Sequence, residues 1–281
     1  MNKEDWNYII HARANWFDLK LSQLWAYRDL ILLFVKRDLV SIYKQTILGP
    51  FWFLIQPVFS TLVYTLIFNK VAKIPTDGIP PTLFYMAGIT AWNYFSDCLN
   101  KTSSTFNANA AIFGKVYFPR LIIPLSVVIS NLIKFGIQFL LLMGFIAFYY
   151  IQGADLHLNR WILFTPVLIL MMGGMGLGSG IIISSLTTKY RDLQYLMAFG
   201  MQLLMYATPV VYPLSILHGK LRMIALLNPM TSIIETFKYA YLGGTEVNFL
   251  HLGYSFLIMI MLLISGLLIF NKVEKTFMDT V

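Results

Sequence analysis

Charged residues are scarce in this sequence. Asp, Glu, Lys and Arg make up 12% of its 281 residues, whereas 58% are hydrophobic. Soluble domains carry about 25% charged residues, so the composition excludes an ordinary water-soluble domain and indicates a chain that crosses a membrane several times. The net charge is +8, and no nucleic-acid-binding motif accompanies it. We therefore attribute the excess of basic residues to segments that flank spans and face anionic lipid, and expect no nucleic acid as a partner.

Sites for metals, cofactors and covalent catalysis are also lacking. Cys98 is the single cysteine, which excludes an intrachain disulfide, and the four histidines are scattered without a carboxylate cluster, an HExxH motif or a Ser-His-Asp arrangement. We expect no bound metal, no cofactor and no catalytic residue on this chain. No Walker A motif occurs: Gly114-Lys115 is followed by Val116, whereas the motif requires Ser or Thr there.

One glycine-rich tract, GGMGLGSG at 173–180, resembles a phosphate-binding loop only superficially. No Lys-Ser/Thr pair follows it, and it lies within an apolar run. Small residues four apart allow two helix backbones to approach closely in lipid. The tract therefore predicts helix packing.

The apolar runs predict an all-α membrane protein with six transmembrane helices, since a span needs about twenty apolar residues. The whole chain, 1–281, is expected to be a single transmembrane domain. Residues 1–29 would form an N-terminal segment, 30–46 an interface helix, 47–270 the six spans and 271–281 a tail. The individual spans are expected at 47–68, 82–98, 121–151, 161–186, 193–212 and 252–270.

The distribution of Lys and Arg predicts the orientation. With the N-terminus in the cytoplasm, fourteen of these residues lie on the cytoplasmic side and six on the other, and Lys134 lies within a span. Basic residues concentrate on the cytoplasmic side of membrane proteins. Both termini are therefore expected in the cytoplasm.

The segment 30–46 has the pattern of an amphipathic helix. Ile31, Val35 and Leu39 form an apolar stripe, with Arg37 and Lys44 on the other side. Such a helix lies in the plane of a membrane surface, with its cations among the lipid phosphates. Since it leads directly into the first span, it indicates transport of an amphiphilic molecule.

The connections between spans contain further short helices. An Ala-rich segment, 106–115, is expected to form a short cytoplasmic helix. Between the last two spans, two short helices at 221–227 and 233–242 are expected, separated by Asn228-Pro229. They could form a gate at the external face or simply a packed cap, and the sequence favours neither.

Two charged residues lie near the middle of spans, Asp97 and Lys134. An ionisable residue within a membrane is a candidate for a functional role. A structural ion pair, or a lysine that extends towards the membrane surface, is the favoured explanation.

Aromatic residues make up 16% of the chain. Aromatic faces pack against the C–H faces of sugars, so a channel lined by them would let a glycan slide. Aromatic residues are also common in spans with no such role. The candidate channel-lining residues are Trp52, Phe53 and Phe59 in the first span and Tyr195, Phe199 and Tyr206 in the fifth.

Several motifs, in order along nearly the whole chain, resemble those of one family. They are RDLVSIYKQTILGPFWFLIQP (37–57), FGKVYFPRLIIPLS (113–126), KYRDLQYL (189–196), TPVVYP (208–213) and LNPMTSIIETFKYA (227–240). Of these, the first is the most specific. Together they resemble the permeases of polysaccharide-exporting ABC transporters, the Wzm, KpsM and TagG kind.

The resemblance implies a six-span permease in the bacterial inner membrane that forms a homodimer. Each copy would pair with a separate Wzt-like nucleotide-binding subunit, which would hold ATP and Mg²⁺, and the complex would export a glycan linked to undecaprenyl pyrophosphate, of the O-antigen kind. The permease itself would not be an enzyme. Its other contacts would be membrane lipids.

The resemblance also assigns roles to segments. The interface helix would contact the lipid head group, 105–117 would hold the coupling helix that docks on the ATPase, and 214–245 would hold the exit gate. An arginine binds phosphate through two parallel hydrogen bonds, which suits the first of these roles. The residues concerned are Arg37, Tyr43, Lys44 and Gln45 for the head group, Phe106, Asn107, Ala111, Phe113 and Lys115 for coupling, and Pro209, Tyr212, Pro213, Asn228 and Pro229 for the gate.

Three alternatives stay open. The same class of exporter could carry teichoic acid, capsule or a hydrophobic drug. An ion-coupled secondary transporter would need interrupted helices, inverted repeats and buried ionisable groups. Here the charged residues are few and no repeat is visible. A membrane enzyme acting on lipid-linked sugars would need an acid, base or metal cluster that the sequence does not offer.

Overall fold

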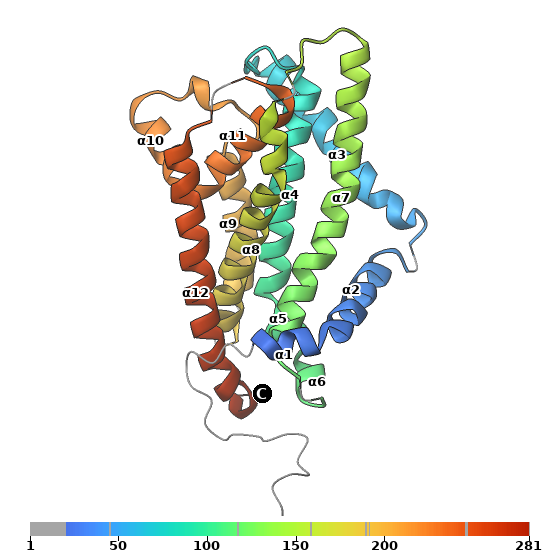
Figure 1. Cartoon of the computed structure of the whole chain (residues 1–281), viewed down its shortest axis with the longest axis vertical. Coiled ribbons are helices and arrows are strands. Elements are labelled where there is room, and N and C mark those ends of the chain that lie inside the picture. The colour runs from blue at the N-terminus through green and yellow to red at the C-terminus, as the bar shows by residue number, and fades with distance from the viewer. Residues whose placement is uncertain are drawn as a thin grey trace, which may run out of the picture.

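The computed structural model describes residues 21–44, 46–116, 118–157, 159–188, 190, 192–244 and 247–280, and these contain helices and no strand. Long helices lie side by side in one bundle (Figure 1). Short helices cap both ends, with α1, α2, α5 and α6 at one end and α10 and α11 at the other. The α-helices are α1 (Leu21–Ala26), α2 (Arg28–Tyr43), α3 (Trp52–Tyr64), α4 (Pro81–Ser103), α5 (Thr105–Ala108), α6 (Ala110–Phe113), α7 (Ile122–Ile151), α8 (Thr165–Thr187), α9 (Leu193–Ala207), α10 (Gly219–Leu227), α11 (Pro229–Leu242) and α12 (Phe249–Thr280).

Within these described ranges, four helical stretches are long and apolar enough to cross a membrane, so the protein is a multi-pass membrane protein. They coincide with the predicted first, third, fourth and sixth spans. The first joins α3 to a 3-10 turn before it (Gly49–Phe51) and a π-helical segment after it (Thr65–Val71). The four are Gly49–Val71, Ile122–Ile151, Arg160–Thr187 and Phe249–Lys272.

Helices α4 and α9 occupy the positions of the predicted second and fifth spans. α4 lies in the middle of the bundle (Figure 1), where most of its side chains from Leu83 to Leu99 are buried against neighbouring helices. Neighbouring helices can supply partners for polar side chains such as Asp97, so α4 need not be as apolar as a helix that faces lipid. α9 has 15 residues and stands beside α4 and α8.

The glycine tract of α8 brings three helices into close contact, as its spacing predicts. A Cβ atom at Gly176 would lie 2.6 Å from the Cβ of Cys98 in α4, and one at Gly178 would lie 2.7 Å from the backbone carbon of Leu262 in α12. Real Cβ atoms do not approach other atoms so closely. The absence of side chains therefore lets α8 pack tightly between α4 and α12.

The hairpin of α10 and α11 confirms the two short helices expected after the fifth apolar run. Asn228 separates them, and its side-chain oxygen accepts a hydrogen bond of 3.0 Å from the backbone N–H of Met230. Pro229 follows at the first helical position, where its fixed φ angle suits a helix start. Both helices begin earlier than predicted: α10 by two residues and α11 by four.

The two ends of the described chain lie at the same end of the bundle (Figure 1). There, the ring of Phe106 in α5 stacks on that of Phe270 in α12, with ring centroids 4.9 Å apart. This contact fixes the short helices to the last long helix.

Candidate functional site

The short helices α2, α5 and α6 meet the start of α7 around a cluster of buried aromatic rings, which we call the α2–α6 junction. Phe34 of α2 lies 5.7 Å from Phe118, and Phe118 lies 5.8 Å from Phe113 of α6, measured between ring centroids. Phe106 completes the cluster and is fully buried. Aromatic pairs at these separations stabilise their contact beyond simple burial, so the rings hold α2 against the loop between α4 and α7.

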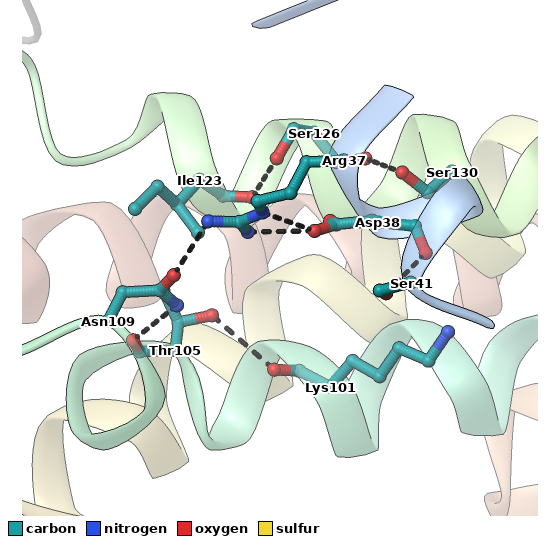
Figure 2. Close-up of polar contacts among 9 residues, drawn as sticks. All are labelled: Arg37, Asp38, Ser41, Lys101, Thr105, Asn109, Ile123, Ser126 and Ser130. Carbon is teal, nitrogen blue, oxygen red and sulfur yellow. Dashed lines mark hydrogen bonds and ion pairs between the residues drawn. The ribbon is translucent and has the colours of Figure 1, made fainter. Parts of the chain in front are cut away.

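A polar link crosses the same junction through Arg37 (Figure 2). Its Nε and Nη2 atoms donate hydrogen bonds of 2.9 and 2.7 Å to Oδ1 of Asp38, and Nη1 donates one of 3.3 Å to Oδ1 of Asn109. The guanidinium also lies over the ring of Phe34, at 4.6 Å from its centroid. Asn109 separates α5 from α6 and is buried. Arg37 thus connects α2 directly to the α5–α6 segment.

Asn109 is itself fixed. Its side-chain nitrogen donates a hydrogen bond of 3.0 Å to the backbone oxygen of Thr105, which leaves the side-chain oxygen for Arg37 (Figure 2). On α7, the buried hydroxyls of Ser126 and Ser130 bond to backbone oxygens of their own helix. Both hydroxyl groups therefore donate their hydrogen bonds within their own helix, and neither is bonded to Arg37.

The α5–α6 segment has one buried side and one exposed side. Phe106, Asn109 and Phe113 are buried. Asn107, Ala111 and Lys115, three of the residues predicted for coupling, are exposed. The remaining two, Phe106 and Phe113, anchor the segment. The arrangement leaves a surface of small and polar residues, about two helical turns long, free to contact another protein.

The predicted head-group residues occupy different surroundings. Arg37 has 38% of its side chain exposed and already has protein partners. Lys44 follows the end of α2 and is exposed, and its backbone N–H bonds to Val40. The side chain of Tyr43 and the whole of Gln45 lie outside the described residues.

Asp97 and Lys134 form an ion pair between α4 and α7. The Nζ atom of Lys134 lies 2.6 Å from Oδ2 of Asp97, and the two side chains are 16% and 28% exposed. One helical turn along α4, the Nζ atom of Lys101 donates a hydrogen bond of 3.0 Å to Oδ1 of Asn131. These two polar contacts join the same two helices.

Most of the predicted channel-lining aromatic residues lie on the surface of the single chain. On α3, Trp52 and Phe59 are exposed, whereas Phe53 is buried at 6% and does not contribute to that surface. Helices α3 and α9 come together where the hydroxyl of Tyr64 in α3 approaches the sulfur of Met205 in α9, at 3.9 Å. On α9 the exposed aromatic residues are Tyr195, Phe199 and Tyr206.

The predicted gate residues connect the end of α9 to the α10–α11 hairpin. The side-chain nitrogen of Asn228 donates a hydrogen bond of 2.7 Å to the hydroxyl of Thr208. The backbone oxygen of Pro209 accepts one of 2.6 Å from Nζ of Lys238. Of the other gate residues, Pro213 is buried, and Tyr212 and Pro229 are partly buried.

Lys238 is the polar centre of this contact. Its Nζ atom lies 3.6 Å from the ring centroid of Phe84 in α4 and 3.7 Å from Oε1 of Glu235. Burial lowers the pKa of Lys238 to about 8, while the nearby Glu235 carboxylate acts to raise it. Through this one side chain, α11, α4 and the end of α9 are held together.

Sequence reasoning missed Phe34, Asn109 and Lys238. Asn109 has a detectable signal, because it stands three residues after Phe106 and four before Phe113 in an otherwise Ala-rich segment. Lys238 is likewise the single cation within the apolar stretch of α11. Within the described residues, no group of three or more His, Cys, Asp or Glu side chains could hold a metal ion.

Comparison with known proteins extends across most of the chain. The family model for the ABC-2 type transporter matches residues 29–242. An O-antigen export system permease protein, RfbA, from Klebsiella pneumoniae is 29% identical over 252 residues, which cover 89% of this chain and 94% of that protein. The protein of the same name from Myxococcus xanthus is 32% identical over 219 residues, covering 77% and 81%. The matched family region includes the α2–α6 junction, the exposed aromatic residues and the gate residues.

Proposed function

The chain belongs to the ABC-2 type transporter family, and from this membership we propose that it is the membrane subunit of an ATP-driven exporter of lipid-linked polysaccharide. The proposed cargo is an O-antigen-type glycan on undecaprenyl pyrophosphate. The observation that carries the proposal is similarity to O-antigen export permeases over as much as 89% of the chain. The protein is a permease, and the proposed location is the bacterial inner membrane with both termini in the cytoplasm.

The ATPase is proposed to be a separate, Wzt-like subunit that holds ATP and Mg²⁺. Its docking surface on this chain would be the exposed side of α5 and α6, which includes Asn107, Ala111 and Lys115. The contacts of the buried side support this role. A push on the exposed side would reach α12 through the ring of Phe106 and α2 through the Arg37–Asn109 hydrogen bond, while Phe113 anchors the segment. Movement of packed helices as rigid bodies is a common way to transmit such a push.

The route for the glycan is proposed to lie between two copies of this chain. Helices α3 and α9 would face it, since they expose the aromatic residues that suit the C–H faces of sugars. In this arrangement α4 and α9 complete the six spans. The hairpin of α10 and α11 would act as the gate at the external end.

The pyrophosphate of the lipid carrier is proposed to meet the end of α2. Lys44 is exposed there, and Arg37 retains about a third of its side-chain surface. Cations stabilise a phosphate that lipid cannot solvate. Lys44 would supply direct charge, whereas Arg37 would add charge while holding the α5–α6 segment.

The test of the proposal is deletion of the gene in its native host. Polysaccharide synthesis should continue, while the polymer stays inside the cell and disappears from the surface. A plasmid that supplies the wild-type chain should restore surface display. Normal surface display in a clean deletion would refute the proposal.

A second experiment distinguishes ATP-driven export from ion-coupled export. The Asp97–Lys134 pair is the observation that an ion-coupled mechanism could use. Substituting the Walker A lysine of the partner ATPase should abolish surface display. An uncoupler of the proton gradient should leave export intact while ATP lasts. The opposite pattern would favour an ion-coupled transporter.

A surface polymer other than O-antigen that is lost on deletion would assign teichoic acid or capsule as the cargo.

A further inference from the structure

A cavity whose wall is mainly apolar, with a few polar side chains, lies at the end of the bundle opposite α5 and α6, and none of the roles above uses it. It has a volume of about 520 Å³ and lies between α10, α11 and the start of α12. Cavities of about 300 to 1,000 Å³ are typical of small-molecule sites. We call it the α10–α12 pocket. The polar residues on its wall that matter here are Arg222, Ser232, Glu235, Thr236, Asn248 and His251.

Helix α10 turns Arg222 and Leu226 towards this pocket and a mostly apolar side away from the protein. Arg222 and Leu226 line the pocket, and Ala225 between them is buried. A helix surrounded by water shows the reverse arrangement, with apolar residues inside. On the other side, four large apolar side chains are 63–71% exposed and surround the exposed Lys220: Leu221, Met223, Ile224 and Leu227. This outward apolar side indicates that α10 lies against lipid, as an interfacial helix does.

The pocket contains one cation, Arg222, and one imidazole, His251, whose side chains have no described partner. Among the described residues, neither the guanidinium of Arg222 nor the imidazole of His251 has a hydrogen-bond or ion-pair partner. The side-chain oxygen of Asn248 accepts from the backbone N–H groups of Leu250 and His251, at 3.1 and 3.3 Å. The amide nitrogen of Asn248 is therefore the half of that side chain left to donate.

The acidic residue of the pocket does not cancel these donors. Glu235 faces the buried ammonium of Lys238, with 3.7 Å between Oε1 and Nζ. The hydroxyl of Thr236 donates to the backbone oxygen of Ser232 at 2.6 Å, and that of Ser232 lies 2.6 Å from the hydroxyl of Ser255. Glu235 thus faces Lys238, and the Asp77 carboxylate accepts hydrogen bonds of 2.8 and 2.9 Å from the hydroxyl of Ser215. Arg222 keeps a positive charge that pairs with no described residue.

We propose that the α10–α12 pocket binds the phosphate group of a membrane lipid whose apolar tail lies along the outward side of α10. Guanidinium groups bind phosphate through two parallel hydrogen bonds, and the exposed leucine, isoleucine and methionine side chains suit a hydrocarbon chain. The pocket with Arg222 and the mostly apolar outward side belong to the same short helix, so a molecule with a charged head and an apolar tail matches both. The site does not depend on which cargo the transporter moves.

The test measures lipid binding by the full-length protein purified in detergent. Three probes are titrated separately: phosphatidylglycerol, undecaprenyl phosphate and inorganic phosphate. We expect at least one lipid to bind, and inorganic phosphate to bind at least tenfold more weakly, because it lacks a tail. The lipid that binds more tightly identifies the source of the phosphate, either the bulk membrane or the polyprenyl carrier.

The variant Arg222→Gln should weaken lipid binding about tenfold, which corresponds to the loss of one charge-assisted contact. The matched control is Arg160→Gln. Arg160 is an exposed arginine that lies outside α10 and does not line the pocket, so this variant should bind lipid like the wild type. Arg222→Lys should fall between the two, because it keeps the charge and loses the planar pair of donors.

Three results would overturn the proposal: equal binding by Arg222→Gln and the wild type, equal loss in Arg160→Gln, or inorganic phosphate binding as tightly as the lipids. If Arg222→Gln fails to purify, His251→Gln takes its place with the same expected weakening. Export in the native host is measured in parallel. Loss of lipid binding with intact export, or intact binding by a chain that exports no glycan, separates this site from the proposed function.

Discussion

Lys134 of α7 and Asp97 of α4 are paired across two helices of the bundle, with 2.6 Å between Nζ and Oδ2. Both side chains are mostly buried. A charge that loses its partner in such surroundings is strongly destabilising, whereas removing both charges together is much less so. The pair therefore provides a direct test of how α4 and α7 are held together.

We predict that Asp97→Asn lowers the free energy of unfolding by about 3 kcal/mol, because it leaves the Lys134 ammonium without its counter-ion. Thermal unfolding of the purified protein measures this. The double variant Asp97→Asn, Lys134→Met should recover a large part of the loss. Asp155→Asn is the control, since the Asp155 side chain is 91% exposed and its loss should have little effect. Equal unfolding temperatures for Asp97→Asn and Asp155→Asn would contradict a structural role for the pair.

The Arg37–Asn109 hydrogen bond leads to a second prediction. If the link between α2 and the α5–α6 segment transmits movement, Asn109→Ala should reduce export several-fold while the partner ATPase continues to hydrolyse ATP. Arg37→Gln should show the same uncoupling. Lys44→Gln leaves this link intact, so it should instead weaken stimulation of the ATPase by the lipid-linked substrate. An Asn109→Ala complex with normal export and normal coupling would show that Arg37 acts only at the head group.

The two sides of the α5–α6 segment should respond differently to substitution. Ala111→Glu places a charge on the exposed side, so it should leave the unfolding temperature of the permease unchanged and prevent productive docking of the ATPase. Phe113→Ala removes a buried ring and should lower the stability of the permease by about 3 kcal/mol. Co-purification of the two subunits and thermal unfolding measure these effects. A complex with Ala111→Glu that assembles and exports normally would refute the docking surface.

The contact between α8 and α12 is tested by Gly178→Ala. The added methyl group would lie 2.7 Å from the backbone of Leu262, so the helices must move apart, and we expect a loss of about 2 kcal/mol, in the range for overpacked sites. Gly144→Ala on α7 is the control, because an added Cβ there meets no atom within 4 Å. It should be neutral or slightly stabilising, since alanine favours a helix over glycine. Similar unfolding temperatures for both variants would contradict the tight contact.

Local patterns in the sequence predicted the features that depend on neighbouring residues. Glycines four apart identified the packing side of α8, and Asn228-Pro229 identified the break between α10 and α11. Hydropathy identified four membrane-crossing helices, because their outer surfaces face lipid and must be apolar. It was weakest for α4, whose surroundings are other helices rather than lipid.

Long-range contacts could not be predicted from the same patterns. Arg37 and Asn109 are 72 residues apart, and only the packing of α2 against α7 brings them together. The amphipathic pattern places Arg37 on the polar side of α2, but it cannot show which residues of other segments Arg37 contacts. Phe53 shows the same limit, since its spacing along α3 resembles that of the exposed Phe59 although its ring is buried.

The way α9 is attached has a mechanical consequence. Met201 is its single buried residue, whereas the residues just after its last turn are held by Asn228 through Thr208 and by Lys238 through Pro209. A helix that is fixed at one end moves most at its other end. A tilt of α9 would therefore displace Leu193 most, at the end closest to α5 and α6, and the helix would pivot about the α10–α11 hairpin.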